Sequence, residues 1–572
     1  MKIKHFFGLA VIAAMTASCS SNEDVRTAGP GTGTNEAGVG YATFSINLPT
    51  TRGTRATSDP EFKPGSTNEY DVFNATLLVF EKGKAASKEG DYTLAEIVDL
   101  GSMEPWKNPN ETGVTTQAKI TAKLENVDKK GDYFALVLLN NGSGADAKVN
   151  LPTKGTKFSD WNVATNADAT NFTDTKKGFY MANAPLFKNN SVTTLVAIDK
   201  NKIFPTEAQA SSGEAAADIY VERGLAKVTL TTATKDEKPV AASSSYAGDK
   251  VKISNWALDV TNLKTFPIHN VDELGYEDIW NNEAASGPST QRFVDNDPGT
   301  LAKRVYWGKD PNYNNNTLLN TDEAGKTARA AEFNYVTANT DVTADPTNPL
   351  YCLENTFNLA NMVQGQTTRV IFKASYTPNG FTEEDGKTFY KIGTSVALWK
   401  EKDLKDHIKA AVTKVITDAT EGNTTIDLAA EGNNITTAGN HEIKAANIKV
   451  TGHKVTDAEV KAVNDKVGLT EKAGISTYAN GESYYIARIK HFGDALTPWT
   501  SGVYGENNLA YLGRYGMLRN NWYELDVQSV SGPGYPDVPE VKPNTPDDED
   551  DKYIKVSVKI LDWAKRSQNV DL

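Results

Sequence analysis

The stretch IYVERGLAKVTLTTAT, residues 219–234, carries the pattern that decides the fold. Apolar and β-branched residues recur from Val221 to Leu230, which is typical of a buried strand. Gly224 interrupts the run, and an isolated glycine within a strand indicates a β-bulge. Strand patterns continue on both sides of this stretch. The chain is therefore predicted to be all-β, with a boundary between two domains within residues 215–250.

Short strand patterns fill most of the chain. Each is rich in valine, leucine, isoleucine and aromatic residues, and each ends in glycine, asparagine or charged turn residues. Two domains, at residues 56–230 and 231–530, are each expected to be a β-sandwich or a barrel. The predicted strands cover residues 74–83, 93–100, 117–127, 133–141 and 191–200 in the first domain, and 250–262, 367–378, 387–399, 482–492 and 520–530 in the second.

Two segments of the second domain depart from the strand pattern. Apolar residues recur at a spacing of 3.6 residues within residues 402–418 and again within residues 456–468. This spacing predicts two amphipathic helices. The fold class expected from the sequence is therefore all-β with small helical insertions.

The composition argues against several classes of function. The 572 residues carry a formal net charge of -13, whereas nucleic-acid binding needs a clustered basic surface. We therefore expect no nucleic-acid partner. The histidines show no pair at metal-ligand spacing, and the acidic runs at 295–299 and 547–551 are more typical of solvated charge than of a calcium loop. The expectation is a protein with no metal, no cofactor and no catalytic site, and thus not an enzyme.

The N-terminus predicts export. A basic start, an apolar run from Phe6 to Met15 and small residues before Cys19 form a signal peptide over residues 1–19. A cysteine directly after small residues resembles the lipobox of bacterial lipoproteins, so Cys19 is the expected lipidation site; an ordinary signal peptide is the alternative. The other cysteine, Cys352, then has no disulfide partner and is expected to be a small buried residue.

Residues 20–55 are predicted to be a propeptide that starts with a polar tether and contains one strand. The apolar residues of this strand alternate with polar ones, the period of a half-buried strand. They are Ala42, Phe44, Ile46 and Leu48. A loop rich in threonine, glycine and proline follows and carries Arg52 and Arg55. An arginine in an exposed, unstructured loop suits a trypsin-like or Arg-specific protease, so a cut in this loop would free the strand.

The C-terminus holds a second strand with the same period. Residues 531–552 are rich in proline and end in an acidic run, so they are predicted to be an extended linker that spans up to about 65 Å. The strand lies within residues 553–572. Its apolar residues are Ile554, Val556, Val558 and Ile560, and Trp563 follows them.

The two strands suit the same groove. If proteolysis frees the first, the domain loses an edge strand, and the tail of a neighbouring chain can pair with the exposed edge by β-augmentation. Repeated head to tail, such contacts do not close and generate a filament. The alternative is that both strands belong permanently to the sheets of their own chain.

Four stretches of the sequence resemble the Bacteroidales fimbrial subunits, also called type V pilins. They are YGMLRNNWYELDVQSVSGPGYPDVPE at 515–540, VERGLAKVTL at 221–230, LLVFEKG at 77–83 and DWAKRSQNVDL at 562–572. Within that family the chain is most similar to the shaft subunits of the short, or minor, fimbriae of Porphyromonas. The resemblance covers nearly the whole length, and its specific motifs lie in these four stretches.

The resemblance implies a fold, a processing route and a function. The fold is two transthyretin-like β-sandwich domains in tandem, followed by an extended donor strand from Ile554 to Trp563. An Arg-specific protease cuts between Arg55 and Ala56, or alternatively between Arg52 and Gly53. The precursor is anchored to the outer membrane by its lipid. Identical subunits then join head to tail in a cell-surface fimbria, with accessory tip and anchor subunits, which supports adhesion and biofilm formation. The alternative function is that of a monomeric surface lipoprotein that binds glycans or host proteins.

Overall fold

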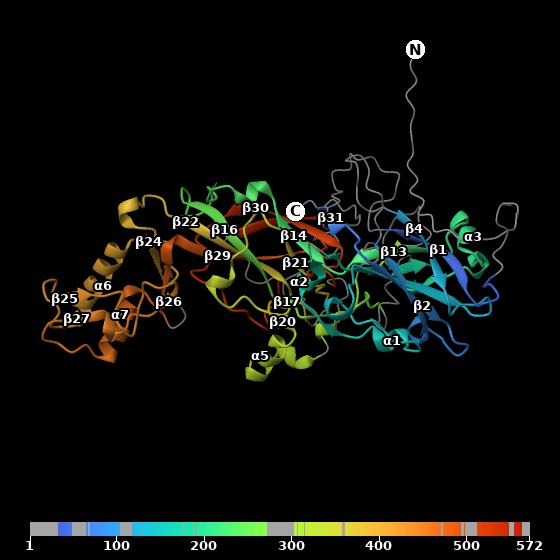
Figure 1. The fold of residues 1–572 in the computed structure, drawn as a ribbon. Coiled ribbons are helices and arrows are strands. Elements are labelled where there is room, and N and C mark those ends of the chain that lie inside the picture. The colour runs from blue at the N-terminus through green and yellow to red at the C-terminus, as the bar shows by residue number, and fades with distance from the viewer. Residues whose placement is uncertain are drawn as a thin grey trace, which may run out of the picture.

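The chain forms three bodies in a row. Figure 1 shows the computed structural model. We call the bodies the barrel (residues 33–223), the sandwich (residues 225–382 and 482–562) and the helical unit (residues 389–478). The structure describes residues 33–47, 65–66, 69–102, 117–174, 177–188, 191–271, 303–305, 307–313, 315–356, 361–470, 473–492, 497, 512–547 and 554–562.

The barrel is a nearly closed sheet. Its strands follow the order β3-β2-β5-β9-β13-β1-β4, and β12 (Val196–Ala197) also pairs with β5. The two ends of this order meet, because the carboxylate of Glu96 in β3 accepts hydrogen bonds from the backbone amides of Glu125 at 2.8 Å and Asn126 at 2.9 Å, just beyond β4. The strands are β1 (Gly40–Asn47), β2 (Ala75–Glu81), β3 (Thr93–Gly101), β4 (Gln117–Leu124), β5 (Tyr133–Leu139), β9 (Met181–Asn183) and β13 (Ala217–Arg223).

The sandwich has two four-stranded sheets around a shared apolar core. One has the order β21-β14-β30-β31, and the other β15-β16-β22-β29. Cys352 lies in this core, and burial raises the pKa of its thiol to about 12, so its predicted burial is confirmed. The strands are β14 (Ala226–Leu230), β21 (Leu350–Cys352), β30 (Asn521–Val530), β31 (Ile554–Asp562), β15 (Lys238–Pro239), β16 (Lys250–Asp259), β22 (Arg369–Thr377) and β29 (Glu482–Arg488).

The helical unit has a core of its own and confirms both predicted helices. Helices α6 (Glu401–Val415) and α7 (Asp457–Val467) pack through Leu404, Ile408 and Val463, among others. Thr456 and Glu459 form a capping box at the start of α7. Their side chains accept hydrogen bonds from backbone amides that have no acceptor within the helix. The strands here are β23 (Phe389–Ile392), β24 (Leu398–Trp399), β25 (Thr424–Ile426), β26 (Gly439–His441), β27 (Ile448–Val450) and β28 (Ile475–Tyr478).

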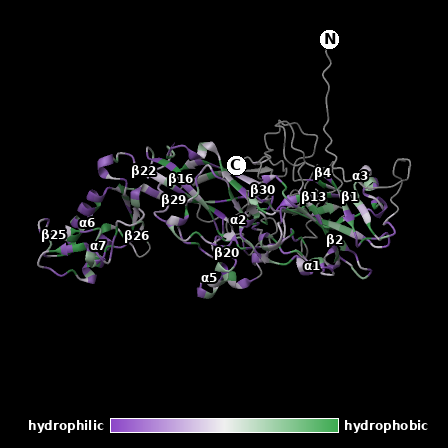
Figure 2. Ribbon diagram, in the orientation of Figure 1, coloured by the Kyte–Doolittle hydropathy of each residue, from purple (hydrophilic) through white to green (hydrophobic). Residues whose placement is uncertain are grey.

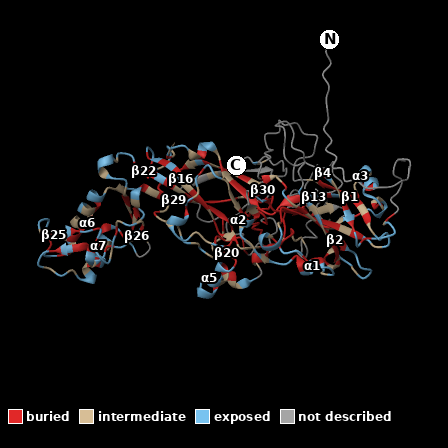
Figure 3. Cartoon of the chain, in the orientation of Figure 1, coloured by how far each residue is buried: buried red, intermediate tan, exposed pale blue. Residues whose placement is uncertain are grey.

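Shorter elements connect and cover these bodies. In Figure 2 apolar residues gather along the strands, and Figure 3 shows the same strands buried. The shorter helices are α1 (Phe158–Trp161), α2 (Ala169–Phe172), α3 (Glu207–Ser212) and α5 (Glu323–Ala330); the shorter strands are β6 (Thr165–Asn166), β7 (Thr173–Asp174), β8 (Gly178–Phe179), β10 (Leu186–Lys188), β11 (Ser191–Thr193), β17 (Thr261–Asn262), β18 (Lys264–Thr265), β19 (Lys303–Arg304) and β20 (Phe333–Asn334).

The predicted bulge at Gly224 is wrong. Strand β13 ends one residue before it in the barrel, and β14 begins two residues after it in the sandwich. A Cβ atom at this position would lie 3.0 Å from the Tyr180 ring and 3.2 Å from the Phe172 ring. Glycine is therefore present because two aromatic rings approach the backbone closely where the chain passes from one body to the other.

Residues 531–547 are the part of the predicted extended linker that the structure describes, and we call them the strap. The strap lies against the sandwich: Tyr484 and Tyr535 exchange two backbone hydrogen bonds of 2.8 Å. The hydroxyl of Tyr485 donates to the Gly532 carbonyl at 2.9 Å, and Arg369 donates to the Pro539 carbonyl at 3.2 Å. Proline removes backbone donors but keeps carbonyl acceptors, so a proline-rich segment docks well on a surface that supplies donors.

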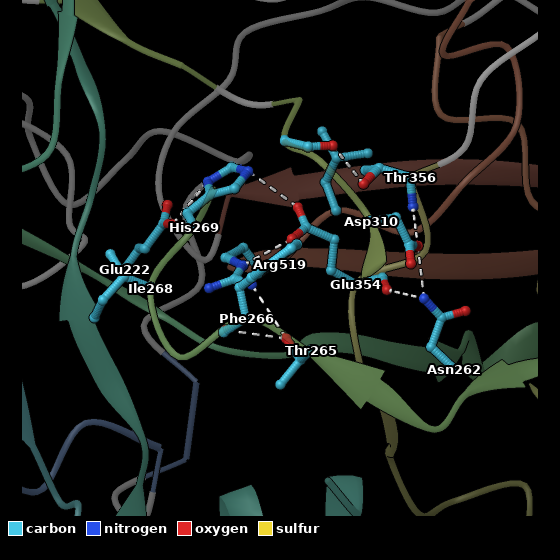
Figure 4. A network of polar contacts seen from close by, with 12 residues as sticks. Glu222, Asn262, Thr265, Phe266, Ile268, His269, Asp310, Glu354, Thr356 and Arg519 are labelled. Atoms are coloured by element: carbon cyan, nitrogen blue, oxygen red, sulfur yellow. Dashed lines mark hydrogen bonds and ion pairs between the residues drawn. The ribbon is translucent and has the colours of Figure 1, made fainter. Parts of the chain in front are cut away.

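A buried network of charges joins the barrel to the sandwich (Figure 4). The ring of His269 lies between two carboxylates, with Nδ1 2.9 Å from Glu222 of β13 and Nε2 3.2 Å from Glu354. Glu354 also contacts Arg519 at 3.0 Å. A Cβ atom on Gly308 would lie 2.0 Å from the His269 ring, so the bare backbone there makes room for the imidazole.

The network keeps His269 charged. Burial alone lowers the pKa of His269, but the carboxylates of Glu354 and Glu222 together outweigh burial and raise it to about 9. Burial likewise favours the neutral form of Glu354, yet the charges of His269 and Arg519 hold its pKa below the usual value. Below pH 9 the His269 imidazolium therefore adds a second positive charge to the network. With it, two cations, His269 and Arg519, balance the two buried carboxylates of Glu222 and Glu354.

A second buried ion pair lies beside this network. The Glu69 carboxylate is 2.6 Å from the ammonium of Lys227 in β14 and accepts a hydrogen bond from the Tyr351 hydroxyl at 2.7 Å. Arg223, the last residue of β13, donates to the Glu69 carbonyl at 2.8 Å. Glu69 thus ties the chain that follows the predicted cleavage loop to both bodies.

This geometry predicts a pH-dependent contribution of His269 to stability. The pKa rises from 6.5 to about 9 on folding, so the stabilisation is complete below pH 6.5 and is lost as the pH rises through 9, with a total on the order of 3 kcal/mol. The free energy of unfolding of the wild-type chain should therefore exceed that of His269→Gln most at pH 6.5, and the difference should shrink by pH 9.5.

Urea unfolding of both chains at several pH values measures this difference. Subtracting one free energy of unfolding from the other cancels the contribution of groups that titrate alike in both chains. One such group is Asp310, whose pKa burial raises to about 7. A difference between the two chains that stays constant from pH 6.5 to 9.5 would contradict the assignment.

Candidate functional site

Strand β1, the predicted removable strand, lies inside the barrel sheet and not at its edge. It pairs in parallel with β13, with Phe44 opposite Ala217, and antiparallel with β4, with Phe44 opposite Ile120. The predicted edge position is therefore wrong. A nearly closed sheet leaves few edges, and this strand forms two rows of backbone hydrogen bonds instead of one. We call its position, between β4 and β13, the β1 slot.

The inner face of β1 is part of the barrel core. Ala42, Phe44 and Ile46 are each 0% exposed, as their alternation predicted. Complete burial of a phenylalanine or isoleucine side chain stabilises a fold by roughly 1.5 to 3 kcal/mol. Leu48, the fourth predicted apolar residue, lies outside the described residues. The strand therefore contributes both to the core and to the hydrogen-bonded sheet.

The outer face of β1 is covered as well. The Thr43 hydroxyl donates to the Ala210 carbonyl of α3 at 2.8 Å and lies 2.8 Å from the Thr121 hydroxyl of β4. At the end of the strand, the Asn47 amide donates to Asp218 of β13 at 2.6 Å. No residue near β1 in the sequence indicates this cover, because α3 comes from a segment far along the chain.

The predicted donor strand lies on its own chain. Strand β31 pairs antiparallel with β30, from Ile554 opposite Val530 to Asp562 opposite Asn521. Val556 is partly buried and packs against the sandwich core. In this structure both strands therefore lie in sheets of their own chain, the alternative that the sequence left open. Trp563 lies outside the described residues.

The strap shortens the distance that the tail can reach. Asp547, at the end of the strap, is 1% exposed; its backbone carbonyl accepts from Arg488 at 2.8 Å, and its carboxylate contacts Thr367. Six residues lie between Asp547 and Ile554, so the distance from one to the other is at most roughly 23 Å when this segment is extended. The predicted reach of about 65 Å therefore applies only if the strap leaves the sandwich.

The processing sites lie outside the described residues. These are Cys19, the predicted cleavage pair Arg55 and Ala56, and the alternative pair Arg52 and Gly53. The acidic run at 295–299 and most of that at 547–551 also lie outside them. Their roles stay predictions.

Metal-ligand clusters and membrane-spanning helices are absent from the described part of the chain. Within it, no group of three or more histidine, cysteine, aspartate or glutamate side chains is arranged to hold a metal ion. None of its helices is both long enough and apolar enough to cross a membrane. A hollow of about 650 Å³ lies between a barrel loop and the sandwich, and Asp146 and Lys177 in its wall are paired at 2.8 Å.

The sequence did not reveal the charges that anchor the slot wall. Glu222 and Arg223 lie beyond the β13 residues that pair with β1, separated from them by one residue, and both are buried at the junction with the sandwich. Their partners His269 and Asn520 come from distant segments, as does Glu354 on the other side of the His269 ring. The one signal in the sequence is that β13 ends in two charged residues after an apolar run, which is compatible with a buried polar contact at that end.

Comparison with known proteins identifies the C-terminal part of the chain. Residues 476–569 match the family described as Major fimbrial subunit protein type IV, Fimbrillin, C-terminal. The match covers β28, β29, β30, the strap and the tail strand β31. No curated protein matches the chain. Residues 476–569 are therefore similar to the C-terminal domain of the fimbrillins, which are major subunits of fimbriae.

Proposed function

We propose that this chain is the shaft subunit of a cell-surface fimbria, released for assembly by proteolysis and polymerised by exchange of a strand. The observation that carries the proposal is the β1 slot. A fully integrated strand precedes an arginine-bearing loop, and the same chain ends in a strand of the same apolar period. The fimbrillin domain that contains this tail supports the proposal.

Strand exchange follows from the cost of an empty slot. If β1 leaves after a cut at Arg55, unpaired backbone groups remain on both β4 and β13, together with an apolar trough. The tail of another subunit can fill this place with four branched apolar residues. They would replace Ala42, Phe44 and Ile46, the buried apolar residues in the described part of β1. The exchange thus replaces lost burial and lost hydrogen bonds by similar ones.

The same proposal covers the fold and the location. The barrel and the sandwich correspond to the two transthyretin-like domains of such subunits. The precursor is exported as a lipoprotein, held at the outer membrane through Cys19, and the mature chain is found in the fimbria. Its partners are identical subunits in a head-to-tail filament, accessory tip and anchor subunits, and an Arg-specific protease. The filament supports adhesion and biofilm formation.

The first test is proteolysis of the purified precursor. An Arg-specific protease should cut once in the loop and give a new N-terminus at Ala56, or at Gly53 if Arg52 is the site. The single variants Arg52→Ala and Arg55→Ala distinguish the two sites, and the double variant should resist the protease. Mass spectrometry of the products and electron microscopy for filaments measure the outcome. Clean cleavage followed by a permanently monomeric product would refute the function.

The second test removes the tail strand, residues 554–572. A shortened subunit should accept a tail but not donate one, so it should not polymerise by itself. Added to cleaved wild-type subunits, it should shorten their filaments in proportion to its share, because it ends each filament that it joins. The thermal melting of the shortened subunit is the control for folding, since β31 also packs on its own sandwich. Filaments of normal length from the shortened subunit alone would rule out the tail as the donor.

A further inference from the structure

The outer face of the β1 slot distinguishes one position from the others. Helix α3 crosses over Thr43, whose hydroxyl is 2.8 Å from the Ala210 carbonyl and 2.8 Å from the Thr121 hydroxyl. Thr43 is 3% exposed and Ala210 is 1% exposed. A strand that replaces β1 must therefore place a small side chain at this point, and a hydroxyl there can donate to the Ala210 carbonyl as Thr43 does.

The tail offers one such side chain. With its apolar residues toward the core, the opposite face of the tail presents Lys555, Ser557 and Lys559. Ser557 is the one small residue of the three, and it carries the required hydroxyl. A lysine beneath α3 would bury an ammonium group beside a backbone carbonyl and a threonine, with no carboxylate bonded to either, which is unfavourable.

The neighbouring position on the slot suits a lysine. Ser45, two residues after Thr43, is also buried, but it lies opposite Asp218 of β13 and Lys119 of β4. Both of these residues are exposed. Asp218 loses its partner Asn47 when β1 leaves. A lysine that flanks Ser557 can therefore reach solvent and pair with the Asp218 carboxylate.

The far end of the slot sets a competing constraint. A Cβ atom at Gly40 would lie 2.7 Å from the Cγ2 atom of Ile203, and a tail with Ser557 at the Thr43 position places an isoleucine there. The tail contains no glycine, so every register brings a Cβ atom to this point, and a shift of two residues would in addition bring a lysine beneath α3. Rotation of the Ile203 side chain away from that Cβ atom costs far less than burial of an unpaired ammonium, so the arrangement with Ser557 beneath α3 is favoured.

We propose that the incoming tail is seated with Ser557 in the place of Thr43, beneath α3, whichever way the tail runs. This register rests on the proposed strand exchange. In this register Ser557 takes the place of Thr43 and donates to the Ala210 carbonyl, so the Ser557 hydroxyl and α3 together select how the tail of one subunit is aligned in the next. Because the side-chain period of a strand is two, an error of one residue would turn every lysine toward the core.

Paired cysteines test the register directly. Thr121 lies next to Thr43 on β4, so Thr121→Cys with Ser557→Cys should form disulfides between subunits when cleaved chains polymerise. A non-reducing gel should show a ladder that reductant removes. The matched controls combine Thr121→Cys with Lys555→Cys or with Lys559→Cys, which lie too far along the strand for the bond. Cys352, the other cysteine of the cleaved chain, is buried.

The outcomes separate the register from the proposed function. Wild-type filaments with a ladder for Ser557→Cys alone support the register. Wild-type filaments with a ladder for Lys555→Cys or Lys559→Cys instead, or with no ladder for any pair, overturn the register and leave strand exchange standing. If cleaved wild-type subunits form no filaments and bind no synthetic peptide of residues 554–572, strand exchange fails and the register fails with it.

Side-chain size and charge give a second measurement. Ser557→Thr keeps the hydroxyl and should polymerise like the wild type. Ser557→Lys should slow filament growth at least tenfold, measured by light scattering after cleavage. Lys559→Ser, which also changes one outward residue of the tail, should slow growth much less. Equal melting temperatures of the uncut variants exclude misfolding, and normal growth of Ser557→Lys would overturn the register.

Discussion

The structure depends on one constraint: a strand inside a nearly closed sheet cannot leave unless another takes its place. Strand β1 is hydrogen bonded to β4 along its length and to β13 from Phe44 to Asn47, fills the barrel core with Phe44 and Ile46, and is covered by α3. An empty slot would expose two rows of backbone donors and acceptors. The contacts of β1 would therefore remain after a cut in the chain that follows it, and loss of the strand would forfeit them unless another strand took its place.

The rest of the chain holds that slot and the tail in defined places. The β13 wall is anchored to the sandwich by Glu222, His269 and Glu354, a network that stays charged below about pH 9. The strap, fixed by Asp547 and Arg488, sets the point from which the tail emerges. Because barrel and sandwich meet through buried charges, breaking one partner leaves an uncompensated charge, which favours a fixed arrangement of the two bodies.

Local features of the fold were predictable because they depend on near neighbours in sequence. The helices at 402–418 and 456–468 match α6 and α7 within a few residues, since apolar spacing and the capping box of Thr456 act over one or two turns. The burial of Ala42, Phe44 and Ile46 followed from period two. By contrast, Gly224 was misread as a bulge because the rings of Phe172 and Tyr180, which require the glycine, come from distant segments.

The sequence alone determined most of the longer strands, which faces of them are apolar, and that the two strands near the ends of the chain share one period. Only the tertiary structure decided which strands they pair with. Backbone hydrogen bonds are the same for every residue, so alternation cannot distinguish an edge from an interior position, or a free tail from one docked on β30. Those choices depend on closure of the sheet through Glu96, on α3 above Thr43, and on charges that folding brings together from remote positions.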